Sequence, residues 1–315
     1  MVEPILPAAG PPSEPRPVLG YAMVWTAAAL FAVNGTVSKV ILETGLSSLR
    51  LTQVRLTGAL AGLAIVVLLF ARASLRVTRR ELPFLIVFGI AGLALLQWFY
   101  FFAIHRLPIG IALLIQYLAP LLVALWARFA MHEPVRRRVW AALALALAGL
   151  ALVVKIWDGV ALDGLGVAAS LAAALMLALY ILLAERAVGR RDPVSLSLYG
   201  FLFGALFWAI IQPLWSFPGE IIGRDVSLLG NLAGAHLPVW ALMLWMIVLG
   251  TILPFGLVVG ALRHISATRV GIVAMLEPVA ATLVAYAWLG ESLSPAQLSG
   301  GAVILAGILL AQTAR

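Results

Sequence analysis

Apolar residues are grouped along this chain in long runs, separated by short stretches with charged residues, glycine or proline. Each run has about 19 to 25 residues, enough to cross ~30 Å of hydrocarbon as an α-helix that rises ~1.5 Å per residue. The pattern predicts an all-α polytopic membrane protein with ten transmembrane helices. We expect these helices at Leu19–Ile41, Ser47–Ala71, Leu82–Ile104, Leu107–Ala130, Val139–Trp157, Gly164–Glu185, Pro193–Ser216, Pro238–Leu262, Thr268–Leu289 and Pro295–Thr313.

The composition supports a bilayer environment. Of 315 residues, 63% are apolar and 11% are charged, and the mean hydropathy is +1.09. A single soluble core cannot bury this much apolar surface, so the excess has to face lipid. The chain has no cysteine, which excludes disulfides and thiolate chemistry, and we predict neither a cofactor nor a metal site.

The first 18 residues are rich in proline and have neither a basic start nor an apolar stretch. This composition predicts a disordered tail over residues 1–18, on the cytoplasmic side, and no signal peptide.

Lys and Arg are distributed unequally between the two sides of the predicted membrane. With the amino terminus inside, fifteen of them fall on the cytoplasmic side and five on the outside, so both termini are expected in the cytoplasm. The basic loops are interpreted as orientation signals, and no nucleic-acid partner is expected. The inside cations are Arg16, Arg72, Arg76, Arg79, Arg80, Arg128, Arg136, Arg137, Arg138, Arg186, Arg190, Arg191, Arg263, Arg269 and Arg315, and the outside ones are Lys39, Arg50, Arg106, Lys155 and Arg224.

The chain contains an internal repeat. An offset of 158 residues aligns identical residues without a gap, among them Leu118 with Leu276, Pro120 with Pro278, and Glu133 with Glu291. An offset of 146 fits the earlier part of each half, so the second half has gained 12 residues, which fit between Pro218 and Leu237. Each repeat, 19–157 and 158–315, has an odd number of spans, so the two cross the membrane in opposite senses. Inverted repeats are typical of transporters that bind their substrate near mid-membrane.

In both repeats the fourth predicted helix carries a proline within the span and leads to a short loop with a glutamate. The motifs are Leu276-Glu277-Pro278-Val279 running to Leu289-Gly290-Glu291, and the degenerate copy Leu118-Ala119-Pro120 running to Glu133. On these motifs the chain resembles the ten-helix EamA-type branch of the drug/metabolite transporter superfamily. The resemblance implies a small-molecule carrier of the bacterial inner membrane, most similar to the aromatic and neutral amino-acid exporters. Ala119 replaces the acidic residue in the first copy, so a symmetric pair of carboxylates is missing.

Polar and aromatic side chains within the spans are the candidates for binding a substrate, because a solute that crosses hydrocarbon needs polar partners there. Gln97, Trp98 and Phe101 are expected on one side of their helix. A lone Asn or Gln is equally compatible with a hydrogen bond between helices. The predicted substrate-binding residues are Asn34, Gln97, Trp98, Phe101, Gln116, Tyr117 and Tyr180.

Three prolines inside spans, Pro120, Pro254 and Pro278, cannot donate to the carbonyl four residues earlier. Each is therefore expected to kink its helix and to free a carbonyl that suits an ammonium group.

Glu277 and Arg55 are the charged residues that lie well inside predicted spans. Two interpretations fit their position equally: a buried ion pair with a structural role, or a role for Glu277 in coupling transport to protons or to the charge of the substrate.

The leading hypothesis is an amino-acid exporter that works by alternating access, with two five-helix bundles rocking about a central cavity. Carriers of another metabolite or drug, such as a purine, a vitamin or a nucleotide sugar, are the alternative. A membrane-embedded enzyme is disfavoured because the four His lie in separate predicted loops without acidic partners, and a channel because the polar positions are asymmetric. The sequence is compatible with a monomer and with a homodimer.

The first prediction concerns topology. Reporter tags at both ends should give cytoplasmic signals and a tag near Gly223 an external one, because the Lys and Arg bias and the inverted repeat agree. A cytoplasmic signal near Gly223 would contradict both the orientation and the ten spans.

Overall fold

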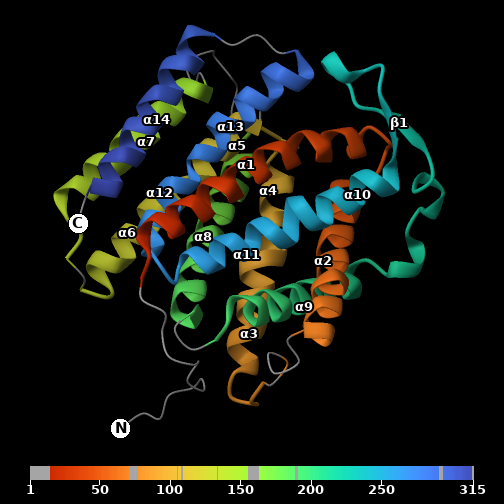
Figure 1. Ribbon diagram of the computed structural model, residues 1–315, viewed down its shortest axis with the longest axis horizontal. Helices are drawn as coiled ribbons and strands as arrows, with labels where there is room; N and C mark the ends of the chain where they lie inside the picture. Colours follow the sequence, from red (N-terminus) through yellow and green to blue (C-terminus); the bar gives the residue numbers. More distant parts are fainter. Residues whose placement is uncertain are drawn as a thin grey trace.

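The structure is a computed structural model that describes residues 15–70, 75, 77–104, 106–107, 109–132, 134–154, 163–188, 191–290 and 294–313. Most of these residues lie in helices packed side by side (Figure 1). In this part of the chain, eight helical segments are long and apolar enough to cross a membrane, and a further apolar helix beginning at Pro295 is shorter. Most of the predicted tail lies outside the described residues, but its last two residues are helical because α1 begins at Pro17.

The first half of the chain has a helix in each of its five predicted spans. The third of these spans contains a π-helical stretch, η2, between two α-helices. The elements are α1 (Pro17–Leu42), α2 (Ser48–Phe70), α3 (Leu82–Gly89), η2 (Ile90–Leu95), α4 (Leu96–Ile104), α5 (Ile109–Gln116), α6 (Ala119–Phe129) and α7 (Arg137–Val154).

The second half repeats this series, with π-helical stretches in its third and fourth spans. Its helices are α8 (Gly164–Val188), α9 (Pro193–Ile211), α10 (Val239–Ile247), η6 (Val248–Ile252), α11 (Leu253–Ala261), α12 (Ala267–Ala274), α13 (Leu276–Val284), η7 (Ala285–Leu289) and α14 (Pro295–Thr313).

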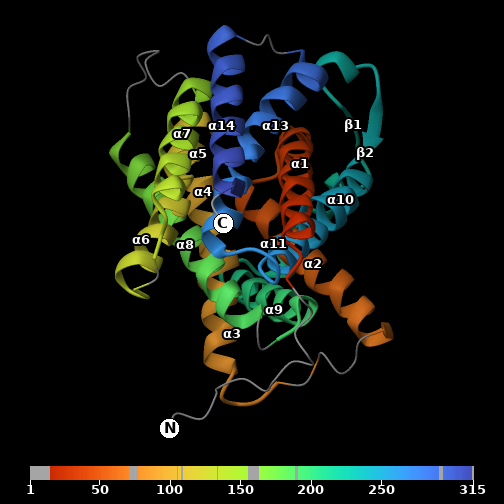
Figure 2. The same cartoon turned by 60° about the vertical axis from the view of Figure 1, so that its left-hand side comes forward.

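A stretch of short elements between α9 and α10 has no equivalent in the first half. It consists of η3 (Leu214–Ser216), η4 (Gly219–Ile221), β1 (Asp225–Ser227), η5 (Gly230–Leu232) and β2 (His236–Pro238), with β1 and β2 antiparallel. Trp288 Nε1 of η7 donates to the Leu228 carbonyl at 2.7 Å, so this stretch covers the end of the ninth predicted span. Figure 2 shows it at the end of the molecule opposite the start of α3. It contains the site where the repeat offsets place twelve extra residues.

The helix bounds follow the repeat offset found in the sequence. At 158 residues, the start of η2 at Ile90 aligns with the start of η6 at Val248, and α5 aligns with α12. Both fourth spans are broken at the equivalent place, since α5 ends at Gln116 and α12 ends at Ala274. The expected kinks at Pro120 and Pro278 are therefore complete breaks between two short helices.

The two halves interlock. Helix α1 lies against α11 and α13 of the second half, and α8 lies against α4, α5 and α6 of the first. The equivalent helices α2 and α9 pack together, as do α7 and α14, which lie side by side in Figures 1 and 2. The prediction of two separate five-helix bundles is wrong as a description of the packing, because α1 and α8 each join helices of the opposite half.

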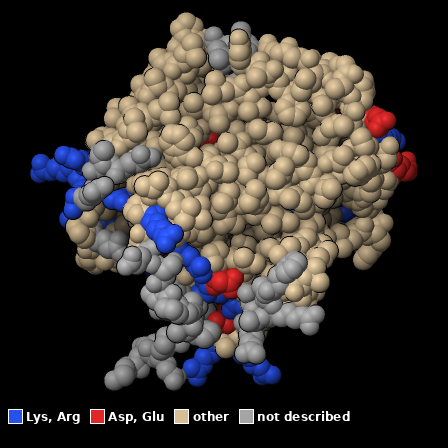
Figure 3. Space-filling model, in the orientation of Figure 1, with Lys and Arg blue, Asp and Glu red and all other residues tan. Residues whose placement is uncertain are grey.

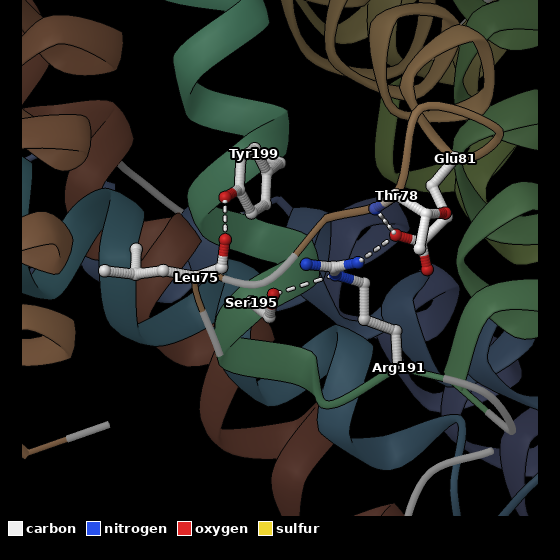
Figure 4. A network of polar contacts seen from close by, with 6 residues as sticks. All are labelled: Leu75, Thr78, Glu81, Arg191, Ser195 and Tyr199. Atoms are coloured by element: carbon white, nitrogen blue, oxygen red, sulfur yellow. Dashed lines mark hydrogen bonds and ion pairs between the residues drawn. The ribbon is translucent and has the colours of Figure 1, made fainter. Parts of the chain in front are cut away.

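The start of α9 is joined to the loop before α3 by a buried polar network (Figure 4). Arg191 and Glu81 form an ion pair of 3.1 Å, and their side chains are 7% and 1% exposed. The remaining contacts are hydrogen bonds from Arg191 Nε to Ser195 Oγ (2.8 Å), from Thr78 N–H to Glu81 Oε2 (2.8 Å) and from Tyr199 Oη to the Leu75 carbonyl (2.7 Å).

The end of α9 is joined to α2 by a second set of hydrogen bonds. Arg50 donates to the Pro213 carbonyl at 3.1 Å and to Ser216 Oγ at 2.5 Å, and Gln53 donates to the Gln212 carbonyl. Helix α9 is thus attached to the first half of the chain at both of its ends.

Apolar side chains cover much of the surface. Figure 3 shows charged side chains near the edges of one face and an almost uncharged expanse between them. Ile210 and Leu69, for example, are 83% and 66% exposed. Exposed apolar area on this scale fits a helix bundle surrounded by lipid.

Helices α7 and α14 approach each other through glycine. A Cβ at Gly300 would lie 2.6 Å from the Gly149 carbonyl oxygen, and a Cβ at Gly149 would lie 2.7 Å from that of Gly300. Small residues at a crossing let two helix backbones come this close in a membrane.

We therefore predict that Gly300→Leu lowers stability by about 1–3 kcal/mol, because the added side chain has to push α7 and α14 apart. Thermal unfolding in detergent measures the effect. Gly256→Leu is the matched control, since a Cβ at Gly256 meets no atom of the described residues within 4 Å. An equal loss in both variants would contradict the packing argument.

Candidate functional site

A cavity of about 140 Å³ lies where the two broken helices meet. Gly271 of α12 faces Pro120 of α6, and a Cβ at Gly271 would lie 3.0 Å from Pro120 Cβ. Residues of α1, α4, α8 and α11 complete the wall. The lining residues are Phe31, Leu96, Gln97, Tyr100, Gln116, Tyr117, Pro120, Leu177, Tyr180, Ile181, Phe255, Val258, Val270, Gly271 and Ala274.

Aromatic rings form one part of the wall. Phe255 contacts Phe31 and Tyr180 edge to face, with ring centroids 5.2 and 5.8 Å apart. Phe88 stacks on Tyr180 from behind the wall at 5.3 Å. Such ring pairs are held by packing and by the complementary charge of ring edge and ring face. This side of the cavity is therefore a firm apolar surface, and it contains the predicted residue Tyr180.

Two amide side chains supply the polar part of the wall. Gln97 is 7% exposed, and among the described residues neither of its side-chain polar atoms has a hydrogen-bond partner. Oε1 of Gln116 is also buried without a partner in this part of the chain. A buried amide left unpaired costs about 1–3 kcal/mol, so a polar solute in the cavity would gain by bonding to these groups.

The side of α4 that faces the cavity differs from the predicted one. Gln97 lines the cavity together with Tyr100, three residues later, whereas Trp98 and Phe101 are not among the lining residues. The Trp98 ring instead lies beside those of Phe99 and Phe102, with ring centroids 4.9 and 6.2 Å apart. The expected grouping of Trp98 and Phe101 with Gln97 is thus corrected. The residue that shares the cavity side of α4 with Gln97 is Tyr100, three residues later.

Asn34 is placed next to the cavity and not in its wall. It is 5% exposed, and its side chain fills the space that a Cβ at Gly250 would need. The predicted role of Asn34 in direct substrate contact is not supported by this position, because the Gly250 backbone covers its side chain.

Tyr117 and Glu277 join the two broken helices. The Tyr117 hydroxyl donates to Glu277 Oε2 at 2.7 Å. Tyr117 lines the cavity in the break between α5 and α6, and Glu277 lies in the first turn of α13. A carboxylate is favoured at a helix start, where the backbone N–H groups carry a partial positive charge.

Arg55 of α2 is buried beside the π-helical stretch η6. It donates to Thr251 Oγ1 at 3.3 Å and to the Gly250 carbonyl at 3.4 Å. Because Pro254 cannot donate to it, this carbonyl is free to accept from Arg55. One of the three carbonyls freed by proline, that of Gly250, thus accepts a hydrogen bond from a cationic side chain of the protein itself.

No ion pair joins Arg55 and Glu277 within the described residues, so of the two interpretations the direct ion pair is not the arrangement in this structure. The Glu277 carboxylate accepts a hydrogen bond from Tyr117, while the Arg55 guanidinium donates to Thr251 of η6. Arg55 and Glu277 thus have separate hydrogen-bond partners beside the cavity.

Three of the aromatic lining residues were not predicted from the sequence: Phe31, Tyr100 and Phe255. Tyr100 could have been found from its spacing of three residues from Gln97. The two Phe residues carry no such signal, because an apolar side chain inside an apolar span resembles its neighbours.

Comparisons with known proteins agree with this architecture. A model of the EamA-like transporter family matches residues 18–155 and 164–313. The threonine/homoserine exporter RhtA of Escherichia coli strain K12 is 30% identical over 249 residues, which cover 78% of this chain and 77% of the exporter. An uncharacterized transporter of Archaeoglobus fulgidus is 30% identical over 278 residues, 88% of this chain and 91% of the relative.

A crystal structure of another protein superposes with a TM-score of 0.77, covering 94% of this chain and 97% of that one at 21% identity, and has the same fold. The relative in Escherichia coli is named as an exporter of amino acids, and the family model covers nearly the whole chain in two successive matches. This chain is a multi-pass membrane protein that belongs to the EamA-like transporter family.

Proposed function

We propose that this protein exports small neutral amino acids across the bacterial inner membrane by alternating access, with both termini in the cytoplasm. The observation that carries the proposal is the cavity between the two broken helices, whose wall combines aromatic rings with Gln97 and Gln116, both of which have buried amide atoms without a hydrogen-bond partner among the described residues. Inverted-repeat transporters commonly bind substrate between discontinuous helices at mid-membrane.

The chemistry of the wall suits a zwitterion with a short side chain. The amides of Gln97 and Gln116 can donate to a carboxylate, and the freed carbonyls of Gln116 and Ala274 can accept from an ammonium group. The starts of α6 and α13 add partial positive charge near a carboxylate. Tyr180 and Phe255 would cover the apolar part of the solute.

The size of the cavity favours small substrates within this class. About 140 Å³ is well below the ~300–1,000 Å³ of pockets that hold drug-sized ligands. The relative in Escherichia coli is named a threonine/homoserine exporter, and both of these amino acids are small and polar. Aromatic amino acids, or larger metabolites and drugs, would require the walls to move apart.

The packing suggests which parts move. Helix α9 is fastened at both ends, by Arg191 and Glu81 at its start and by Arg50 at its end. The motion is therefore assigned to two groups of helices, each packed together, α4 and α6 with α8, and α11 and α13 with α1. The breaks in the fourth spans would act as hinges, since their backbone lacks continuous helical hydrogen bonds.

Counterflow into proteoliposomes tests the function. Vesicles loaded with unlabelled threonine should accumulate labelled threonine, and competition should be strong for small neutral amino acids and weak for tryptophan. A carrier shows saturation and stimulation by internal substrate. Uptake that neither saturates nor responds to internal amino acid would contradict the proposal.

The amide wall predicts a specific variant effect. Gln97→Leu should lower threonine counterflow about tenfold, because removing a hydrogen bond to a charged group costs ~1.5–3 kcal/mol. Trp98→Phe, on the neighbouring position outside the wall, should keep the rate near that of the natural protein. Equal losses at both positions, with unchanged unfolding temperatures, would argue against this wall as the binding surface.

Glu277 is proposed to couple transport to protons or to the charge of the substrate. Glu277→Gln should insert and unfold normally, while transport is strongly reduced or becomes independent of pH, because the variant keeps the shape and removes the titratable group. Efflux measured across a pH series gives the answer. Tyr117→Phe is the control, since it removes the hydrogen bond and leaves the carboxylate, so pH dependence should persist. Normal transport by Glu277→Gln with an unchanged pH profile would end the coupling proposal.

A further inference from the structure

A second hollow, of about 410 Å³, lies between α6 and α8 and is separate from the substrate cavity. The two helices use different sides for the two spaces, because Tyr180 lines the cavity and Leu179 and Leu182 line the hollow. Apart from Arg186, every side chain in its wall is apolar, including Trp126 and the 70% exposed Phe129. Figures 1 and 2 show α6 near the outside of the bundle. The exposed lining residues Trp126 and Phe129 indicate that the hollow is a groove open toward the surrounding lipid.

The equivalent helices of the other half lack the bulky and charged side chains of this groove. At the 158-residue offset, Phe129 of α6 corresponds to Ala287. At the 146-residue offset, Leu182 corresponds to Thr36 and Arg186 to Val40 of α1, which are 7% and 1% exposed. Thus α1 buries these positions while it packs along α13. The groove is a property of the α6 side and does not follow from the repeat itself.

Arg186 places a positive charge at one end of the groove. It lies in the last turn of α8, its side chain is exposed, and no ion pair or hydrogen bond to it occurs within the described residues. The carboxylate of the neighbouring Glu185 bonds to another helix, since Glu185 Oε1 accepts from the backbone N–H of Ala267 at 2.6 Å. The charge bias of the loops assigns this end of α8 to the cytoplasmic leaflet.

We propose that this groove binds an anionic phospholipid of the cytoplasmic leaflet. One acyl chain would lie along the leucine and aromatic side chains of α6 and α8, and the phosphate would bond to the guanidinium of Arg186. An apolar wall that ends in a cation is complementary to an acyl chain that ends in a phosphate, and a planar guanidinium can bind phosphate through two N–H groups. Basic pockets between transmembrane helices on the cytoplasmic side bind anionic headgroups in this way.

The bound lipid would fill the groove that α6 and α8 form on the side of α8 away from Tyr180 and the substrate cavity. This inference concerns the lipid and not the transported solute, so it holds or fails independently of the proposed substrate.

Native mass spectrometry of the full chain provides the test, with phosphatidylglycerol and phosphatidylcholine of identical acyl chains as probes. The natural protein should retain phosphatidylglycerol over phosphatidylcholine. Arg186→Gln should lower retention of phosphatidylglycerol about fivefold, to the level of phosphatidylcholine, as expected for loss of one cation near anionic lipid. Leu179→Trp, which fills the groove, should lower retention of both lipids.

Arg263→Gln is the matched control, because Arg263 is an exposed arginine on the same predicted membrane side, at the end of α11 and outside the groove. It should keep the preference for phosphatidylglycerol. Equal retention of the two lipids by the natural protein would overturn the proposal, and so would a loss in Arg263→Gln as large as in Arg186→Gln. Unfolding temperatures in lipid-free detergent verify that each variant is folded.

Discussion

Inside hydrocarbon, every backbone N–H and C=O has to find a partner within the protein, and this constraint determines where the helices of this chain can be interrupted. The interruptions at Tyr117 and Met275 lie at the centre of the bundle, where surrounding helices shield them from lipid. A break leaves carbonyls that no helix satisfies, and a cavity beside it lets a solute use them. The constraint thus places the irregular backbone and the binding cavity at the same point.

The packing of the two repeats is symmetric, whereas the polar residues of the site are not. Helix pairs such as α7 and α14 keep the two-fold relation between the halves, because packing depends mainly on size and shape. The chemistry does not keep it, since Glu277 corresponds to Ala119 and Tyr117 corresponds to Met275. The hydrogen bond from Tyr117 to Glu277 therefore has no symmetric copy, because the equivalent residues Met275 and Ala119 cannot form one.

The sequence predicted the features that depend on local composition. The ten helical segments follow from apolar length, and the breaks at Pro120 and Pro278 follow from missing N–H donors. The orientation of side chains within a span was less predictable. Gln97 lines the cavity together with Tyr100 and not with Trp98, because which side of α4 faces inward depends on helices distant in the chain. The separation of Arg55 from Glu277 likewise depends on tertiary partners, the carbonyl of Gly250 and the hydroxyl of Tyr117.

The π-helical stretches η2 and η6 occur at the same repeat position, Ile90 and Val248. A π-helical turn accommodates one residue more than an α-helical turn, and such turns are rare and are found mostly at functional sites. A shared position in both halves is most simply explained by a single event in an ancestral five-helix unit before it was duplicated. The differences at Ala119 and Glu277, and in the segment between α9 and α10, then arose after the duplication. On this history, the distorted third helix is older than the polar specialisation of one half.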